Sequence, residues 1–100
     1  MSQQKKLYVI VRKDLSISQR AVQAGHAVAE FLLRGPTSRW SNGTLVYLGV
    51  KNLQQLEKWM FRLKRCNVDY AVFHEPDIGN EPTALATDQG EAFMKGLNLL

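Results

Sequence analysis

Two carboxylates lie where buried segments of the sequence are expected to end. Asp14 follows the apolar run 7–11, with Gln23 soon after it, and Glu75 follows a second apolar run, 68–74. Such a group of side chains can polarise a water molecule or position a substrate ester. If the two runs are neighbouring parallel strands, both carboxylates reach the same edge of the sheet, where open α/β sheets bind their ligands.

Two of the candidate residues also have a structural interpretation. His26 precedes Glu30 by one helical turn, and such a pair on a solvated face stabilises a helix by only about 0.2–0.5 kcal/mol. Asp14 can serve simply as a residue at the start of a helix, near the positive end of the helix dipole. Both interpretations stay open for His26 and Asp14 at this point.

The charge of the chain is unevenly distributed. The net charge is +4, but residues 1–74 carry 12 Lys and Arg against four acids, and residues 75–100 carry one Lys against five acids. A basic body attracts polyanions such as RNA through counterion release, although many small basic domains are merely soluble. Lys58, Arg62 and Arg65 recur at helical spacing and suit either backbone phosphates or a solvated face.

Several classes of site are not predicted. Cys66 is the only cysteine, so no internal disulfide is possible, and His26 and His74 fall on different elements without a metal-binding motif. There is no glycine-rich phosphate loop and no Gly-x-Ser-x-Gly elbow. No apolar run reaches the roughly 20 residues of a membrane span. We therefore expect a cytoplasmic protein with no metal, no cofactor and no membrane partner.

The elements that position these residues follow from apolar periodicity and capping signals. Ser16 with Gln19, or alternatively Ser18, can cap the first helix, and Asn52 with Gln55 the second. The predicted elements are a strand at 7–11, a helix from Ser16 to Gly35-Pro36, a strand at 44–48, a helix from Asn52 to Asn67, strands at 68–74 and 83–87, and a short helix at 88–96. One polar stripe is predicted on the first helix, formed by Gln19, Gln23, His26, Glu30 and Arg34.

This order, β-α-β-α-β-β-α, predicts a single-domain α/β fold. Strands joined through a helix are expected to pair in parallel. The short connection between the last two strands favours an antiparallel hairpin, so the sheet is expected to be mixed and four-stranded, with helices flanking it. Residues 1–6 are predicted to form a disordered tail before a domain at 7–100.

The order of the motifs resembles that of the type II peptidyl-tRNA hydrolase family. Arg12-Lys13-Asp14-Leu15 followed by Gln23-Ala24-Gly25-His26-Ala27 is similar to the opening of that family. Asn42-Gly43-Thr44-Leu45-Val46-Tyr47-Leu48 stands at its second strand, Glu75-Pro76-Asp77-Ile78-Gly79-Asn80 at its acidic loop, and Thr83-Ala84-Leu85-Ala86 at its threonine-containing strand. The resemblance extends from Leu7 to Leu100.

The resemblance implies a homodimeric hydrolase that cleaves the ester between peptide and tRNA. Asp14, Glu75 and Thr83 are then expected to orient water and substrate, with Gln23 and His26 supplying hydrogen bonds. Arg12, Arg20, Asn80 and the basic residues Lys58, Arg62 and Arg65 are expected to bind peptidyl-tRNA. Trp40 and Phe61 are candidates for the dimer interface.

The sequence also departs from the family pattern. Where the family carries Gly-Lys-Gly-Lys, with a lysine implicated in catalysis, this chain has Ser16-Ile17-Ser18-Gln19-Arg20. Arginine does not replace lysine in proton transfer, and Glu75 stands in place of an aspartate. The alternative to the hydrolase is therefore a non-catalytic RNA- or protein-binding module on the same fold.

Overall fold

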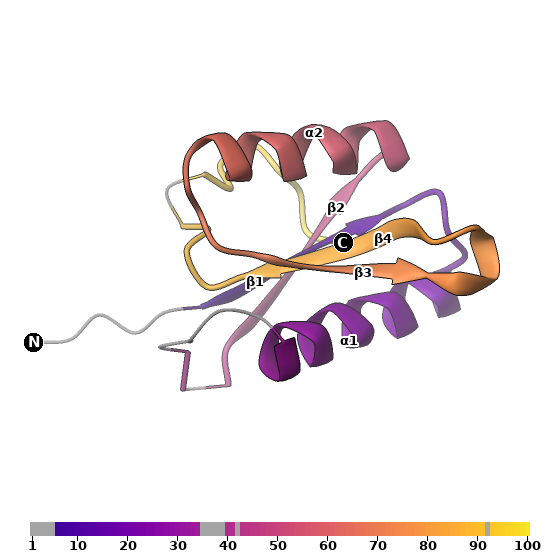
Figure 1. Ribbon diagram of the computed structural model, residues 1–100, viewed down its shortest axis with the longest axis horizontal. Coiled ribbons are helices and arrows are strands. Elements are labelled where there is room, and N and C mark those ends of the chain that lie inside the picture. The colour runs from indigo at the N-terminus through magenta and orange to yellow at the C-terminus, as the bar shows by residue number, and fades with distance from the viewer. Residues whose placement is uncertain (1–5, 35–39, 42, 92) are drawn as a thin grey trace, which may run out of the picture.

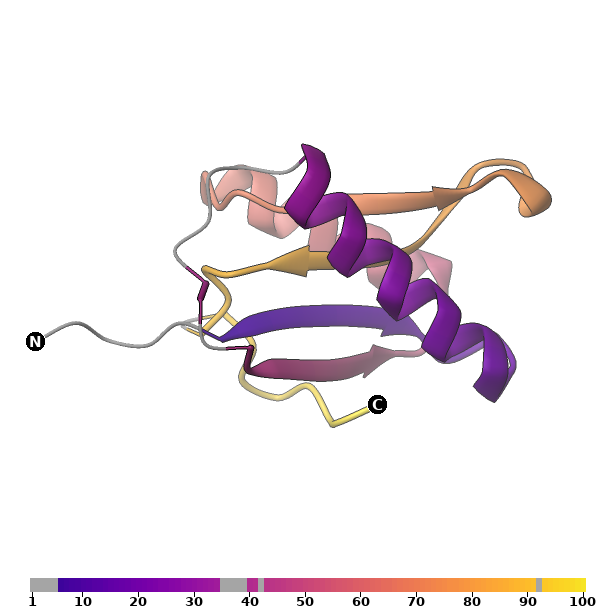
Figure 2. The ribbon, with the colours of Figure 1, turned by 90° about the horizontal axis from the view of Figure 1, so that it is seen from below.

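The chain forms one four-stranded mixed sheet. The computed structural model describes residues 6–34, 40–41, 43–91 and 93–100. The strands are β1 (Leu7–Arg12), β2 (Leu45–Val50), β3 (Ala71–Glu75) and β4 (Glu81–Thr87), in the order β2-β1-β4-β3. β1 and β2 are parallel, whereas β4 is antiparallel to both of its neighbours, β1 and β3 (Figure 2). The predicted fold class and the antiparallel hairpin are confirmed.

Two helices cover the two faces of the sheet. α1 (Ile17–Arg34) lies below the sheet and α2 (Leu53–Arg65) lies above it in Figure 1. β1 is buried on both faces, because Val9 and Val11 pack toward α1 while Ile10 packs toward the α2 side. This is the arrangement that the uninterrupted apolar run of β1 predicts. Neither helix of the described part is long and apolar enough to cross a membrane.

The predicted caps form at both helices. The Ser16 hydroxyl accepts a hydrogen bond from the Gln19 amide at 3.2 Å, and the Asn52 side chain accepts one from the Gln55 amide at 3.1 Å. Asn67 follows α2 with a φ of 56°, the left-handed conformation that ends many helices. The tail predicted at 1–6 and the stop signal Gly35-Pro36 lie almost wholly outside the described residues; Lys6 alone is described, and it is exposed.

The short terminal helix expected at 88–96 does not form among the described residues, which contain turns and a bridge between Leu48 and Leu99. The Thr87 hydroxyl accepts a hydrogen bond from the Gln89 amide at 3.1 Å, and Gly96 adopts a φ of 92°. Both features bend the chain, so the last residues run beside β2 instead of coiling.

Candidate functional site

The ends of β1 and β3 lie at one edge of the sheet. Both strands are antiparallel to β4, so they run in the same direction, and their last residues face the first residues of β4 (Figure 2). The sequence interpretation placed both carboxylates at one edge on the condition that the two strands are neighbours. They are not neighbours, because β4 lies between them. The short β3–β4 turn makes this insertion possible, and the predicted edge is shared even so.

A continuous network of side chains joins three elements at this edge. The Gln23 amide nitrogen on α1 donates to Glu75 Oε1 at the end of β3, at 2.7 Å. The Thr83 hydroxyl on β4 donates to the Gln23 amide oxygen at 2.6 Å. Gln23 and Thr83 are each only 1% exposed, whereas Glu75 is half-buried. The network therefore fixes one carboxylate at the boundary between the core and solvent.

Local sequence places each member of this network. Gln23 precedes Ala24, and Ala24 and Ala27 let α1 lie close to the sheet, which brings the glutamine side chain under the β3–β4 hairpin. The hairpin turns tightly because Gly79 and Asn80 adopt φ values of 72° and 61°. A glutamine from the predicted polar stripe is thus buried rather than solvated.

A second cluster surrounds the buried guanidinium of Arg12. Its Nε and Nη2 donate to the two oxygens of Asp14 at 3.0 and 2.8 Å, and its Nη1 donates to Glu81 Oε1 at 2.8 Å. The hydrogen bond from Arg12 lowers the pKa of the Asp14 carboxyl, and the carboxylates raise the pKa of Arg12. Arg12 and Asp14 therefore form a two-point ion pair. Glu81 forms the second ion pair of Arg12, and the sequence interpretation did not predict this role.

Acid unfolding should report on the pair formed by Arg12 and Asp14. Because the folded pKa of Asp14 is lowered, the pair stabilises the fold above the unfolded value of about 3.9, and this stability is lost as pH falls through the folded pKa. We expect Asp14→Asn to lower the urea-unfolding free energy at pH 7 and to have a smaller effect at acid pH, where the folded carboxyl becomes protonated. In an Arg12→Gln background the same substitution should have little effect at either pH, and an equal loss in both backgrounds would contradict the assignment.

Two other predicted residues, Arg20 and Asn80, have local roles. The Arg20 guanidinium donates to the backbone carbonyls of Leu15 and Lys13, at 3.0 and 2.6 Å, and so braces the connection between β1 and α1. Asn80 lies exposed in the β3–β4 turn, and its backbone amide donates to the backbone carbonyl of Glu75 at 2.9 Å. Asn80 therefore shapes the turn that presents Glu75.

His26 is exposed and stacks on the Phe73 ring, with the ring centroids 4.3 Å apart. Its expected helical partner Glu30 instead accepts a hydrogen bond from Arg34 at 2.8 Å. The stacking places His26 against β3, on the face of the sheet that α1 covers.

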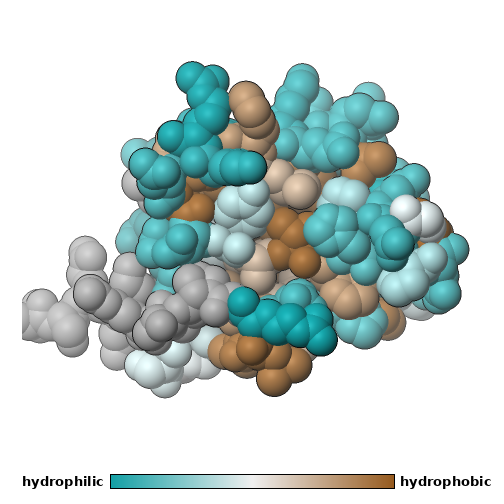
Figure 3. Space-filling model, in the orientation of Figure 1, coloured by the Kyte–Doolittle hydropathy of each residue, from teal (hydrophilic) through white to brown (hydrophobic). Residues whose placement is uncertain are grey.

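The predicted basic residues lie on the opposite face of the sheet. Lys58, Arg62 and Arg65 are exposed on α2, where Figure 3 shows hydrophilic side chains along the top of the molecule. The Arg62 guanidinium lies 5.0 Å from the Trp59 ring centroid, and that of Arg65 lies 5.8 Å from the Phe61 centroid. The structure therefore does not bring this basic face into the network around Glu75.

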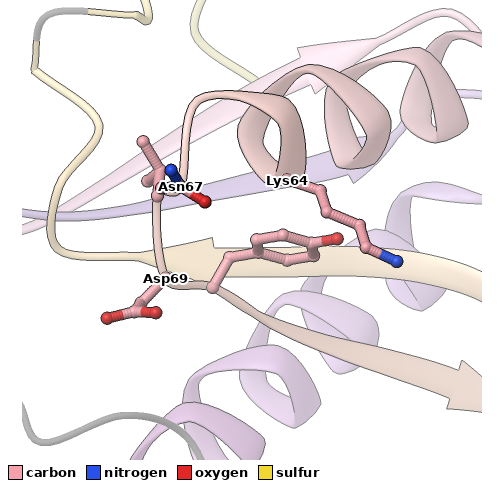
Figure 4. A pocket seen from close by; sticks show the side chains of 5 residues that line it. Lys64, Asn67 and Asp69 are labelled. Carbon is pink, nitrogen blue, oxygen red and sulfur yellow. The ribbon is translucent and has the colours of Figure 1, made fainter.

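A hollow on the surface lies away from the network. It is lined by the end of α2 and the segment that leads into β3, including Lys64, Asn67 and Asp69 (Figure 4). None of the predicted site residues lines it. Within the described residues, no cluster of His, Cys, Asp or Glu side chains is able to hold a metal ion.

Comparisons with known proteins bear on the fold. No family model matches this chain, and no curated protein matches its sequence. A solved structure of a protein of unknown function from Agrobacterium tumefaciens is similar over 99% of both chains, with a TM-score of 0.72 and 15% sequence identity. At that identity the similarity concerns the fold alone, which is therefore shared with a second protein over nearly its whole length.

Proposed function

We propose that this chain hydrolyses the ester that joins a peptide to the 3′ end of tRNA, as its resemblance to the type II peptidyl-tRNA hydrolases implies. The observation that supports the proposal is the network of Glu75, Gln23 and Thr83. In the sequence, Gln23 is separated from Glu75 by 52 positions and from Thr83 by 60 positions. A buried amide that orients a half-exposed carboxylate at a sheet edge is an arrangement suited to acid–base chemistry.

In the proposed reaction, Glu75 acts on a water molecule. Its Oε1 is held by Gln23, and its Oε2 accepts a weak hydrogen bond from the Asp77 amide at 3.4 Å. The carboxylate accepts a proton as the water oxygen bonds to the ester carbonyl carbon. When the bond to the ribose oxygen breaks, that oxygen takes the proton, and the products are a free peptide acid and tRNA.

Gln23 and Thr83 are positioning residues in this scheme. The amide of Gln23 can donate to Glu75 only in one orientation, and the Thr83 hydroxyl selects that orientation by donating to the amide oxygen. Side chains held in this way keep a reacting group in place without reorganisation during the reaction.

The direct test is to incubate the purified chain with a defined, labelled peptidyl-tRNA and follow the release of peptide. We expect catalytic turnover above the rate without protein. The same preparation is also tested for binding to deacylated tRNA. Binding without peptide release would favour the alternative, a non-catalytic RNA-binding module.

One feature of the structure favours that alternative. Asp14 is occupied by Arg12, and the Arg20 guanidinium is occupied by two backbone carbonyls. The Asp14 carboxylate is therefore engaged in an ion pair, and the segment 16–20 supplies no lysine in place of the family's. The hydrolase scheme consequently depends on Glu75 alone as its acid–base group.

The basic face of α2 is proposed to bind the tRNA backbone. Replacing Lys58, Arg62 and Arg65 together by alanine removes three cations that can contact phosphates without reading bases. We expect tRNA affinity to fall for all sequences and the salt dependence to become shallower by about three units of slope. An affinity and a slope equal to those of the wild type would identify this face as a solvated surface only.

We also propose a homodimer that acts in the cytoplasm. Of the two candidate interface residues, Trp40 packs against the core of its own chain, whereas Phe61 is 63% exposed. Leu32 and Leu33 add exposed apolar surface on α1. Light scattering at micromolar concentrations should give twice the monomer mass, and a monomer mass throughout that range would contradict the dimer.

A further inference from the structure

A second hollow lies at the same edge of the sheet as Glu75, beyond the ends of the parallel strands β1 and β2. Its charged and polar lining consists of Lys13, Lys51, Gln55 and Asn98, and Gly49 also lines it. We call this hollow the β2-edge pocket. Among the described residues that line it, two are cations and none is a carboxylate. It therefore differs in sign from the β3 end of the edge, where Glu75, Asp77 and Glu81 gather.

The pocket is built by backbone contacts on two sides. The Lys13 amide donates to the Val50 carbonyl at 2.7 Å, which ties the end of β1 to the end of β2. The Gly49 amide donates to the Asn98 carbonyl at 3.0 Å, which holds the C-terminal segment beside β2. The pocket walls are thus fixed by hydrogen bonds rather than by mobile side chains alone.

Gly49 permits the close approach of Lys13. A Cβ atom at position 49 would lie 2.6 Å from Cδ and 2.8 Å from Cγ of Lys13, so any larger residue would displace the lysine side chain. The lysine stem thus lies directly along the glycine backbone. This contact gives the pocket a specific geometry that a random pair of surface lysines lacks.

The two cations of the pocket have no anionic partner. Across residues 6–34, 40–41, 43–91 and 93–100, the ion pairs belong to Arg12 and Arg34, and neither Lys13 nor Lys51 forms one. Two lysines that line one hollow, together with a glutamine and an asparagine, suit an anion with several oxygens, such as a phosphate. In the part of the chain that the structure describes, no aromatic ring on which a nucleobase could stack lines the pocket. The lining therefore favours a backbone phosphate over a free nucleotide.

We infer that the β2-edge pocket binds phosphate groups of the single-stranded 3′ end of tRNA. The identity of this ligand rests on the proposed function. β2 and β3 are the outer strands of the sheet, so three strand spacings of about 4.8 Å separate the pocket side from the Glu75 side. Phosphates bound in the pocket beside β2 would leave the terminal ribose and its ester free to reach Glu75 at the end of β3.

The test measures the affinity of deacylated tRNA over a series of salt concentrations. Because this ligand has no ester, the result does not depend on hydrolysis. We expect the double variant Lys13→Gln/Lys51→Gln to bind on the order of tenfold more weakly, with a salt slope shallower by about 1.4. Both lysines are exposed, so thermal melting should confirm that the variant is folded.

Two further variants separate the pocket from general charge. Lys6→Gln removes one exposed cation before the start of β1, at the end of that strand opposite to the pocket. We expect Lys51→Gln to weaken tRNA binding clearly more than Lys6→Gln does. Gly49→Ala keeps every charge but displaces the Lys13 side chain, and it should also weaken binding. Equal effects of Lys51→Gln and Lys6→Gln, or wild-type tRNA binding by Gly49→Ala, would contradict the inference that this pocket binds tRNA phosphates.

The pocket and the hydrolase can fail separately. Weaker tRNA binding by the double variant, in a protein that releases no peptide, would retain the pocket and reject the hydrolase. If the wild-type protein releases peptide but the pocket variants bind tRNA as tightly as it does, the hydrolase would be retained and the pocket rejected.

Discussion

Glu75→Gln is expected to reduce peptide release from peptidyl-tRNA by about 100-fold or more, the scale of lost acid–base assistance. The variant keeps the size of the side chain and an oxygen that can still accept the hydrogen bond from Gln23, but it can no longer take a proton from water. The melting temperature should change little, because Glu75 is half-buried and contributes little packing. The single-turnover rate of peptide release, measured with folded enzyme in excess of substrate, reports the effect.

Asp77→Asn is the matched control for this variant. Asp77 lies exposed in the same turn, and the same carboxylate-to-amide change is made two residues away. We expect it to release peptide at close to the wild-type rate. If Glu75→Gln and Asp77→Asn both retain wild-type turnover, Glu75 only shapes the β3–β4 turn and the proposed chemistry is wrong.

Gln23→Leu is expected to lower the free energy of unfolding by about 2–3 kcal/mol. The leucine fills a similar volume, so the loss comes from hydrogen bonds rather than from a cavity. The buried Thr83 hydroxyl loses its acceptor at 2.6 Å and keeps only the Phe73 carbonyl at 3.5 Å, while Glu75 loses its donor. Urea unfolding at neutral pH measures the change.

Gln19→Leu makes the same change one helical turn earlier. Gln19 is exposed and shares only a long hydrogen bond of 3.3 Å with Gln23, so we expect a loss below about 0.5 kcal/mol. Combining Gln23→Leu with Thr83→Val should cost less than the two separate changes added, because each removes the partner of the other. Full additivity would show that the two side chains do not act together.

Much of the fold can be predicted from local sequence. The apolar run of β1 indicates a strand buried on both faces, and Ser16 and Asn52 indicate the starts of the two helices, because these signals depend only on neighbouring residues. The β3–β4 hairpin follows in the same way from a short connection. The prediction of a terminal helix was wrong, because a turn at Thr87 and the bridge between Leu48 and Leu99 shape this part of the chain instead.

The site could be predicted only in part. Glu75 and Asp14 were placed at the correct edge, because strand direction alone decides which ends meet. The burial of Gln23 could not be foreseen, since Gln19 and Gln23 look alike in the periodic pattern. Only a hairpin arriving from a distant part of the chain distinguishes them. The role of Glu81 beside Arg12 likewise depends on a contact between residues 69 positions apart.

In the proposed hydrolase, the ester end of peptidyl-tRNA meets the edge formed by Glu75, Gln23 and Thr83. The most direct measurement is a nuclear magnetic resonance titration of the isotope-labelled chain with a tRNA that carries its peptide through a stable amide. At saturation, we expect the largest shift changes between this ligand and deacylated tRNA at the side-chain amide of Gln23 and at the backbone amides of Glu75 and Thr83. Differences confined to α2 or to the opposite edge of the sheet, with these three residues unchanged, would contradict the account.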